Sequence, residues 1–363
     1  MKSIERARVS DYKYFAPIRE IYNSSEKIIT VIVDCYYELD LVKQSIQSVL
    51  DQDYINVELM IVDNGSHDDI SQYLDSIYRS NVNTALIKFY TNQFSWKDTS
   101  ITVITCWNAG LSHCKGDIVG HLNYDDMLSS NCCTKMDFLF KNNNNCVTAA
   151  PLPVSINAIG EINQEFSKVI ETENRRGQYI DGKKLALDYI QNSPKKYFSA
   201  PGGVLFTKKE VLVKYGGFDR APDITQIIKF AIHGDSGFDS KAKLFWRHHD
   251  KQANKKGKLR GVVWCGDLRD AVKTHNIIGI WDQIFPKDQV DLLKKFIKKS
   301  GLNNGLDIAI EALRKKHFFI FLRVLKNVLI KCPAAVIYVT YHSLLEMAVM
   351  LNEKIFKVKN SIR

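Results

Sequence analysis

The clearest indication of the fold comes from the segment Lys115-Gly-Asp-Ile-Val-Gly-His-Leu-Asn-Tyr-Asp-Asp126. Residues 118–122 form an apolar run that ends in a polar tip with two adjacent carboxylates, which predicts a buried strand delivering acid groups to the carboxyl edge of a sheet. Open α/β sheets bind ligands at that edge. Two carboxylates and an amide oxygen suit a hard divalent cation held against substrate phosphates. A plain strand-to-loop turn is the alternative for these residues alone, because Asn and Asp also favour turns.

Strands and helices alternate on both sides of this stretch. Residues 28–34 are a β-branched run typical of a strand buried on both faces, and residues 42–50 carry apolar side chains at helical spacing. A strand over 57–62 follows, so the sheet begins with a parallel βαβ unit. The pattern continues with strands at 85–90, 118–122 and 146–150 and helices at 101–112 and 130–140. It predicts a doubly wound α/β half.

The phosphate-binding motifs of two common α/β classes are missing. No Gly-x-Gly-x-x-Gly follows the first strand, and no Gly-x-x-x-x-Gly-Lys-Ser/Thr occurs in the chain, which disfavours dinucleotide-binding and P-loop proteins. The second half is less regular. It predicts a strand within 201–206, helices over 208–215 and 223–233, and a strand over 243–249 that brings an arginine and paired histidines to its end. Strand alternation allows only one of the two histidines to face the site.

The net charge of +10 belongs to the C-terminal tail. Residues 294–363 contain 14 basic and 4 acidic residues, whereas the preceding chain has 36 of each. A neutral body with a basic helical tail fits an anionic membrane surface better than nucleic acid. The eight cysteines show no paired or zinc-type spacing, which favours free thiols in a reducing compartment.

We expect a cytoplasmic protein, either free or peripheral at the inner face of the membrane. Residues 1–27 have no apolar core of signal-peptide type, and no apolar run of membrane-spanning length occurs. After Arg314 an amphipathic helix is predicted, which Pro333 ends; it rests on a membrane or packs against the body or a partner subunit. Its apolar stripe is Phe318, Phe321, Leu322, Leu325 and Leu329, with Lys316, Arg323 and Lys326 away from it.

Seven sequence blocks together resemble the successive signatures of family 2 glycosyltransferases. The resemblance covers roughly residues 28–254 and implies the GT-A fold, a Rossmann-like, mostly parallel sheet with helices on both faces, here with a basic C-terminal helical extension. We accordingly expect an N-terminal extension over 1–27, a GT-A domain over 28–266 with nucleotide-sugar and acceptor halves over 28–127 and 128–266, and a helical region over 267–363. The blocks are residues 48–54 and 58–66, Asn108-Ala-Gly-Leu, Lys115-Gly-Asp, Asn123-Tyr-Asp-Asp126, Gly216-Gly-Phe-Asp219 and Arg247-His-His249.

The resemblance implies an inverting transfer of a sugar from a nucleotide diphosphate donor, usually UDP-linked, to an acceptor hydroxyl, with Mn²⁺ or Mg²⁺. The acceptor would be a glycan, a polysaccharide precursor, a lipid-linked sugar or a protein, and a homo-oligomer is compatible with the sequence. Asp63 would bind the donor base, Asn108 and Arg247 the donor, and Asp126 the sugar or the metal shell. The implied metal ligands are Asp125, Asn123 and His249, and the implied catalytic base is Asp223.

The chain departs from the family pattern at several of these blocks. Asn123 stands at the usual first Asp of the DXD motif, Asp34 and Tyr37 replace a Pro and an Asn, Trp107 replaces an Arg, and Pro222 replaces a Glu. The departures at Asn123 and Pro222 motivate an alternative, a binding or scaffold subunit without catalysis. A nucleotidyltransferase, which would release pyrophosphate, is a third possibility.

Overall fold

The computed structural model describes residues 11–94, 99–173, 177–192, 205–252, 267–315, 317–331, 336–345 and 349. The chain divides into two compact units, Met1–His249 and Asp250–Arg363, each described by itself here. The division falls before the expected boundary at 266/267, and residues 253–266 lie outside the described residues.

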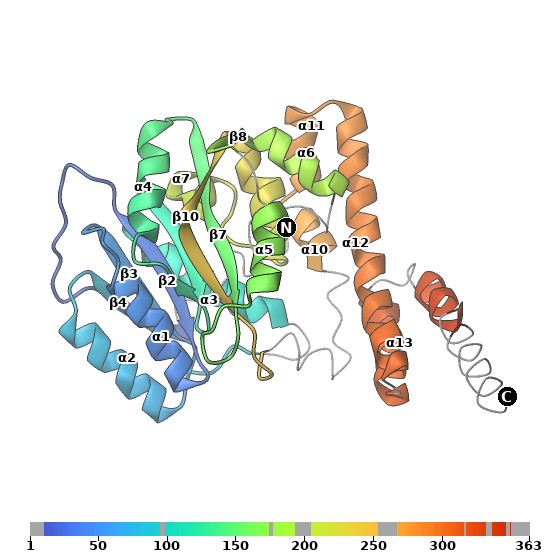
Figure 1. Cartoon of the computed structure of the whole chain (residues 1–363), viewed down its shortest axis with the longest axis horizontal. Helices are drawn as coiled ribbons and strands as arrows, with labels where there is room; N and C mark the ends of the chain where they lie inside the picture. Colours follow the sequence, from blue (N-terminus) through green and yellow to red (C-terminus); the bar gives the residue numbers. More distant parts are fainter. Residues whose placement is uncertain are drawn as a thin grey trace. The chain divides into compact units, whose positions relative to one another are not determined.

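A mixed sheet is the framework of the first unit (Figure 1). In the described part its order is β1-β4-β3-β2-β5-β9-β7-β10-β6, with β8 paired to β10. The expected α/β fold is confirmed. The strands are β1 Tyr12–Phe15, β2 Ile29–Cys35, β3 Val57–Asp63, β4 Thr84–Phe89, β5 Ile118–Asn123, β6 Met127–Leu128, β7 Cys146–Ile156, β8 Tyr179–Asp181, β9 Phe206–Lys208 and β10 Asp235–Arg247.

The parallel block β4-β3-β2-β5 contains the point at which the chain reverses its direction of winding. From β2 the chain first adds β3 and β4 on one side and then returns to place β5 on the other. In open α/β sheets a crevice forms at such a point, outside the carboxyl ends of the two strands. Here those ends are Asp34 of β2 and Asn123 of β5, which are register partners.

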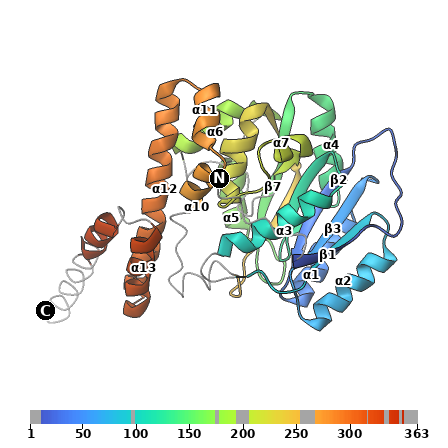
Figure 2. The same ribbon diagram turned by 180° about the vertical axis from the view of Figure 1, so that it is seen from behind.

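Helices cover both faces of this block because its strands are apolar on both sides. The helices α1 Leu39–Leu50, α2 Asp68–Ser80 and α4 Cys132–Asn142 pack on the face that includes Val31, Val33 and Ile61 (Figure 1). The helices α3 Thr99–His113 and α7 Lys209–Lys214 pack on the opposite face with Ile32 and Met60 (Figure 2).

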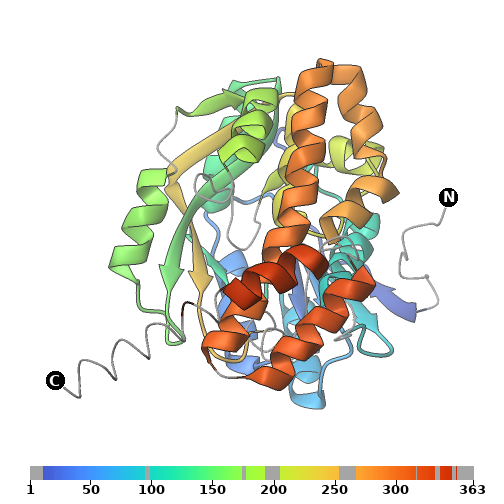
Figure 3. The ribbon, with the colours of Figure 1, turned by 90° about the vertical axis from the view of Figure 1, so that its right-hand side faces the viewer.

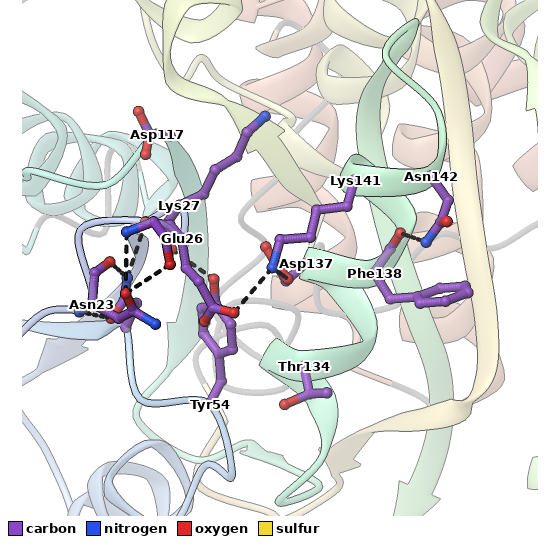
Figure 4. Close-up of polar contacts among 12 residues, drawn as sticks. Asn23, Glu26, Lys27, Tyr54, Asp117, Thr134, Asp137, Phe138, Lys141 and Asn142 are labelled. Atoms are coloured by element: carbon purple, nitrogen blue, oxygen red, sulfur yellow. Dashed lines mark hydrogen bonds and ion pairs between the residues drawn. The ribbon is translucent and has the colours of Figure 1, made fainter.

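The described part of the expected N-terminal extension belongs to the first unit. β1 pairs antiparallel with β4 at the edge of the sheet. Farther along, Glu26 and Asp137 both accept from Lys141 of α4, at 3.4 and 2.7 Å, and Tyr54 donates to the Lys27 carbonyl at 2.7 Å (Figure 4). We did not predict β1, because a four-residue edge strand carries little periodicity.

The expected single helix over 223–233 is divided into three short segments. They are α8 Pro222–Thr225, the π-helical turn η2 Gln226–Phe230 and the 3₁₀ turn η3 Ala231–His233. Lys229 of η2 is fully buried, and its Nζ donates to the Gly217 carbonyl at 2.9 Å. The remaining helices of this unit are α5 Gln164–Glu173 and α6 Gly182–Asn192.

The second unit is helical in its described part. It contains α10 Asp267–Thr274, α11 Ile277–Ile284, α12 Lys287–Arg314, α13 Phe318–Lys331 and a helix over 336–345. Figure 3 shows α13 and the last helix against the lower part of α12, where Phe321, Val324 and Val339 share one apolar cluster. Among the residues that could be searched, none of the helices has both the length and the apolar character needed to span a membrane.

Candidate active site

The carboxyl ends of three parallel strands bring the first candidate residues together. Cys35 of β2 is the register partner of Asp63 of β3, and Asp34 is the partner of Asn123 of β5. Asp63 and Asn123 therefore lie on either side of the end of β2. The sequence predicts this convergence because parallel strands end at the same edge of a sheet.

Asp125 and His249 form a buried pair at this edge. His249 Nε2 lies 2.9 Å from Asp125 Oδ2, and the two residues are only 7% and 8% exposed. Their meeting follows from the sheet, because β6, directly after Asp126, pairs antiparallel with β10, whose end leads into His249. His248 instead packs edge-on against Trp246 and Phe166, so the two histidines face different ways as expected.

This pair suits a divalent cation that also binds phosphate. A carboxylate oxygen and an imidazole nitrogen are both common ligands, and two protein ligands leave positions for a diphosphate. Asn123 donates from Nδ2 to Asp126 Oδ2 at 3.0 Å. The side-chain oxygen of Asn123, Oδ1, is therefore the atom able to face a cation. In the described part no cluster of three or more His, Cys, Asp or Glu side chains forms a complete protein cage. These residues therefore fit a metal ion that is coordinated partly by the protein and partly by a bound diphosphate.

A hydrogen-bonded turn fixes the Asp63 carboxylate at the end of β3. Its Oδ1 accepts from the Ser66 backbone N–H at 2.9 Å and from the Ser66 hydroxyl at 2.6 Å, which fixes the carboxylate at the start of the loop. Tyr36 follows β2, and its ring lies 6.4 Å from the His67 ring at an interplanar angle of 26°. We did not predict roles for Tyr36 or His67, since single rings after strands carry no distinctive spacing.

Asp223 lies in the first turn of the short helix α8, and the preceding turn holds it in place. Ala221 adopts a left-handed conformation with φ 52°, and its carbonyl accepts from the N–H groups of Ile224 and Thr225. A left-handed alanine is strained, and such strain is concentrated at functional sites. The Asp223 side chain reaches solvent, yet the surrounding protein desolvates it and raises its pKa to about 6.

Comparison with known proteins identifies the first unit. Residues 30–186 match the family described as "Glycosyl transferase family 2". These residues are a family 2 glycosyltransferase domain. An uncharacterised glycosyltransferase of Haemophilus influenzae is 28% identical over 116 residues, a match that covers 32% of this chain and 43% of that protein.

One solved structure confirms the GT-A architecture of this domain. S. aureus TarS 1–349 in complex with UDP-GlcNAc matches with a TM-score of 0.53 at 14% identity, over 90% of this chain and 92% of that one. The mannosyltransferase PcManGT from Pyrobaculum calidifontis, in complex with GDP-Man and Mn²⁺, has a TM-score of 0.49 at 14% identity and covers 88% and 81%. The second likeness is too distant to bear on function.

Arg247, for which we expected contact with the donor, makes its hydrogen bonds to the Asp125 loop and to neighbouring protein groups. It is fully buried, and its Nε donates to the Asp125 carbonyl at 2.8 Å. Nη1 donates to the carbonyls of Asn157 and Ala158, and Nη2 to Gln44 Oε1 and the Met127 sulfur. These partners occupy the five N–H groups of a guanidinium, which leaves none for phosphate.

Asp126, for which we expected contact with the sugar or the metal shell, links the ends of β5 and β10 through its hydrogen bonds. Its carboxylate accepts from the Arg247 backbone N–H at 2.9 Å and from Asn123 at 3.0 Å, and it is only 1% exposed. Burial, and then the Asp125 carboxylate, raise its pKa well above the usual range. Asp126 and Arg247 together therefore hold the Asp125 loop against the strand that carries His249.

Asn108 has a structural role in place of the expected contact with the donor. Its Nδ2 donates to the Phe218 carbonyl at 2.9 Å, and its Oδ1 accepts from the Phe218 N–H at 2.8 Å. Gly217 adopts φ 81°, and a β-carbon there would lie 2.4 Å from Asn108 Oδ1. Asn108 and the glycine together fasten the loop that leads to Asp223.

Asp34 and Trp107 form a pair that the sequence did not predict. Trp107 Nε1 donates to Asp34 Oδ1 at 3.0 Å. Burial raises the pKa of Asp34 to about 7 against the opposing effect of this hydrogen bond, and the Asp125 carboxylate adds to the rise. The indole also packs on His121, which is a buried core residue as expected, and on Phe218.

Proposed function

We propose that the protein transfers a sugar, with inversion, from a UDP-linked donor to an acceptor hydroxyl in glycan, polysaccharide or glycolipid synthesis. One observation carries this proposal. The buried Asp125–His249 pair and the carboxylate of Asp63 lie at the carboxyl edge of the same parallel block, as a diphosphate and its base require. The family of the domain supports the reaction class.

The nucleobase of the donor would bind at the ends of β2 and β3. Both hydrogen bonds of Asp63 with Ser66 end on Oδ1, so Oδ2 is the atom that would accept from the ring N–H of uracil. Tyr36 follows β2 and His67 follows β3, their rings lie 6.4 Å apart, and aromatic faces stack well on a planar base.

Mn²⁺ or Mg²⁺ would be held by Asp125 and His249, with the carbonyl oxygen of Asn123 as a third ligand. When bound, the ion supplies positive charge to the departing diphosphate. Arg247 and Asp126 keep the two main ligands in register by joining their backbones.

Asp223 would act as the general base. The acceptor oxygen attacks the anomeric carbon, the bond from that carbon to the diphosphate breaks, and the hydroxyl proton moves to the carboxylate. A pKa of about 6 keeps Asp223 mostly ionised at neutral pH and raises its basicity above that of an ordinary Asp. A single displacement of this kind inverts the anomeric configuration.

The decisive experiment incubates the purified full chain with a panel of UDP-sugars and GDP-sugars, with and without Mn²⁺. We expect slow release of a nucleoside diphosphate, dependent on the metal, for one donor. Release of pyrophosphate would indicate a nucleotidyltransferase. Absence of both donor binding and turnover with Mn²⁺ and Mg²⁺ would favour the scaffold alternative. The hydrogen bond from Asn123 to Asp126 is compatible with that alternative, because it engages the Asn123 side chain within the protein.

We also propose a cytoplasmic location, because six described cysteines are buried free thiols, as in proteins of reducing compartments.

A further inference from the structure

The helix α13 has two apolar faces, and only one of them is packed. Phe321, Val324 and Val328 are buried in the cluster with α12. The opposite face carries large side chains that remain in solvent, with Phe319 85% and Ile330 68% exposed. The stripe expected from the sequence is therefore split, since Phe321 and Leu325 pack inward. Phe318, Leu322 and Leu329 complete the outward apolar set.

The next helix, over 336–345, repeats this arrangement. Val339 and Ser343 are buried on its inner side, and Val339 joins the same cluster as α13. Its outer side exposes Ile337 at 82% and Tyr341 at 62%, together with Tyr338, Leu344 and Leu345. Two consecutive helices of the second unit thus expose ten large apolar side chains. Monomeric proteins seldom leave an apolar surface of this kind uncovered.

The charges on these helices identify the partner. Arg323 and Lys326 are exposed and lie among the outward apolar residues of α13. Neither residues 318–331 nor residues 336–345 contain an Asp or a Glu. A second copy of the same surface would bring like charges together, which opposes self-association. A surface with apolar groups and negative charge would match both properties.

We infer that the outward faces of α13 and of residues 336–345, here called the lipid face, insert shallowly into an anionic phospholipid leaflet. Amphipathic helices that combine large apolar side chains with Lys and Arg bind in this way. Tyr338 and Tyr341 suit the interfacial depth, because their rings are apolar and their hydroxyls polar. The inference concerns the second unit and does not depend on the proposed transfer reaction.

The test is co-sedimentation of the full chain with vesicles of phosphatidylcholine alone or mixed with phosphatidylglycerol. We expect binding to the mixed vesicles that weakens with salt. Phe319→Ser with Ile330→Ser should lower the partition coefficient at least about tenfold, because each exposed side chain loses its burial in lipid. Arg323→Gln with Lys326→Gln should reduce binding to the anionic vesicles only.

The control is Ile159→Ser, which removes a 77% exposed apolar side chain from the first unit and should leave vesicle binding unchanged. We expect every variant to fold, because all the changed side chains are exposed. Circular dichroism and thermal unfolding check this. Equal vesicle binding by the Phe319/Ile330 variant would overturn the inference. So would an oligomer, seen by sedimentation velocity without lipid, that the same variant dissociates.

Discussion

Trp107 and Asp34 hydrogen-bond to each other at 3.0 Å, which joins two positions at which the sequence departs from the family pattern. The carboxylate at the end of β2 comes close enough to Asp125 to raise its own pKa, and the indole restrains it. The departures are therefore a matched pair, in which one side chain adds a partly buried acid and the other supplies its hydrogen-bond donor.

The stability of the metal-free protein should depend on the protonation of Asp34. Its folded pKa of about 7 is above that of an unfolded aspartate, so folding favours the protonated form. The contribution of Asp34 to the free energy of unfolding is complete below about pH 4 and is lost as the pH rises through 7. The free energy of unfolding of Asp34→Asn should therefore rise by about 4 kcal/mol relative to that of the wild type between pH 4 and pH 8, because about 3 pKa units correspond to about 1.4 kcal/mol each. Urea unfolding at several pH values measures this difference, and a pH-independent difference would refute it.

Trp107→Phe should destabilise the protein by about 1 to 3 kcal/mol at pH 8, because the buried carboxylate loses its donor while the ring packing is kept. The same substitution in the Asp34→Asn background should cost clearly less. A double-mutant cycle by urea unfolding measures the coupling between the two side chains, and zero coupling would mean that the hydrogen bond contributes nothing.

Substitution of the buried ligand pair should weaken metal binding. Asp125→Ala and His249→Ala should each lower the affinity for Mn²⁺ in the presence of UDP by about tenfold to a hundredfold, since each removes one of two main ligands. Titration followed by electron paramagnetic resonance measures free Mn²⁺. His248→Ala is the matched control, because that ring faces Trp246 and Phe166. An unchanged affinity in the His249 variant would remove this residue from the site.

Asp223→Asn should lower kcat by about a hundredfold to ten-thousandfold while leaving the affinity for UDP unchanged, because the general base acts on the acceptor alone. In the wild type, activity should fall as the pH drops through about 6, where the carboxylate takes up its proton. Initial rates against pH and UDP binding by calorimetry test both parts. If the activity of the variant fell with decreasing pH in the same way as that of the wild type, the general base would be another residue.

Arg247→Lys should reduce the free energy of unfolding by about 2 to 4 kcal/mol, because a lysine leaves several buried carbonyls without a donor. Arg79→Lys, on an exposed helix surface, should be neutral. Chemical unfolding measures the stabilities. If Arg247 bound phosphate directly, the variant would lose affinity for UDP without losing stability, the opposite of our expectation.

Much of the first unit follows from local sequence patterns. The β-branched runs and helical spacings between residues 28 and 150 predict the parallel block, and Asp63, Asn123 and Asp125 follow because strands of one direction end at one edge. Less could be predicted beyond residue 200. The helix expected over 223–233 is interrupted by a π-helical turn with a buried lysine, a feature without a distinctive periodicity.

The sequence by itself determined the fold class, the family and the edge at which the acids gather, because these depend on periodicity and on the order of short motifs. Only the tertiary structure decided what each polar side chain does there. Arg247, Asp126 and Asn108 hydrogen-bond to backbone groups within the protein. Asp34 hydrogen-bonds to Trp107, which lies 73 residues away in the sequence. Residue type specifies how many hydrogen bonds a group can make, but only packing determines whether protein or ligand receives them.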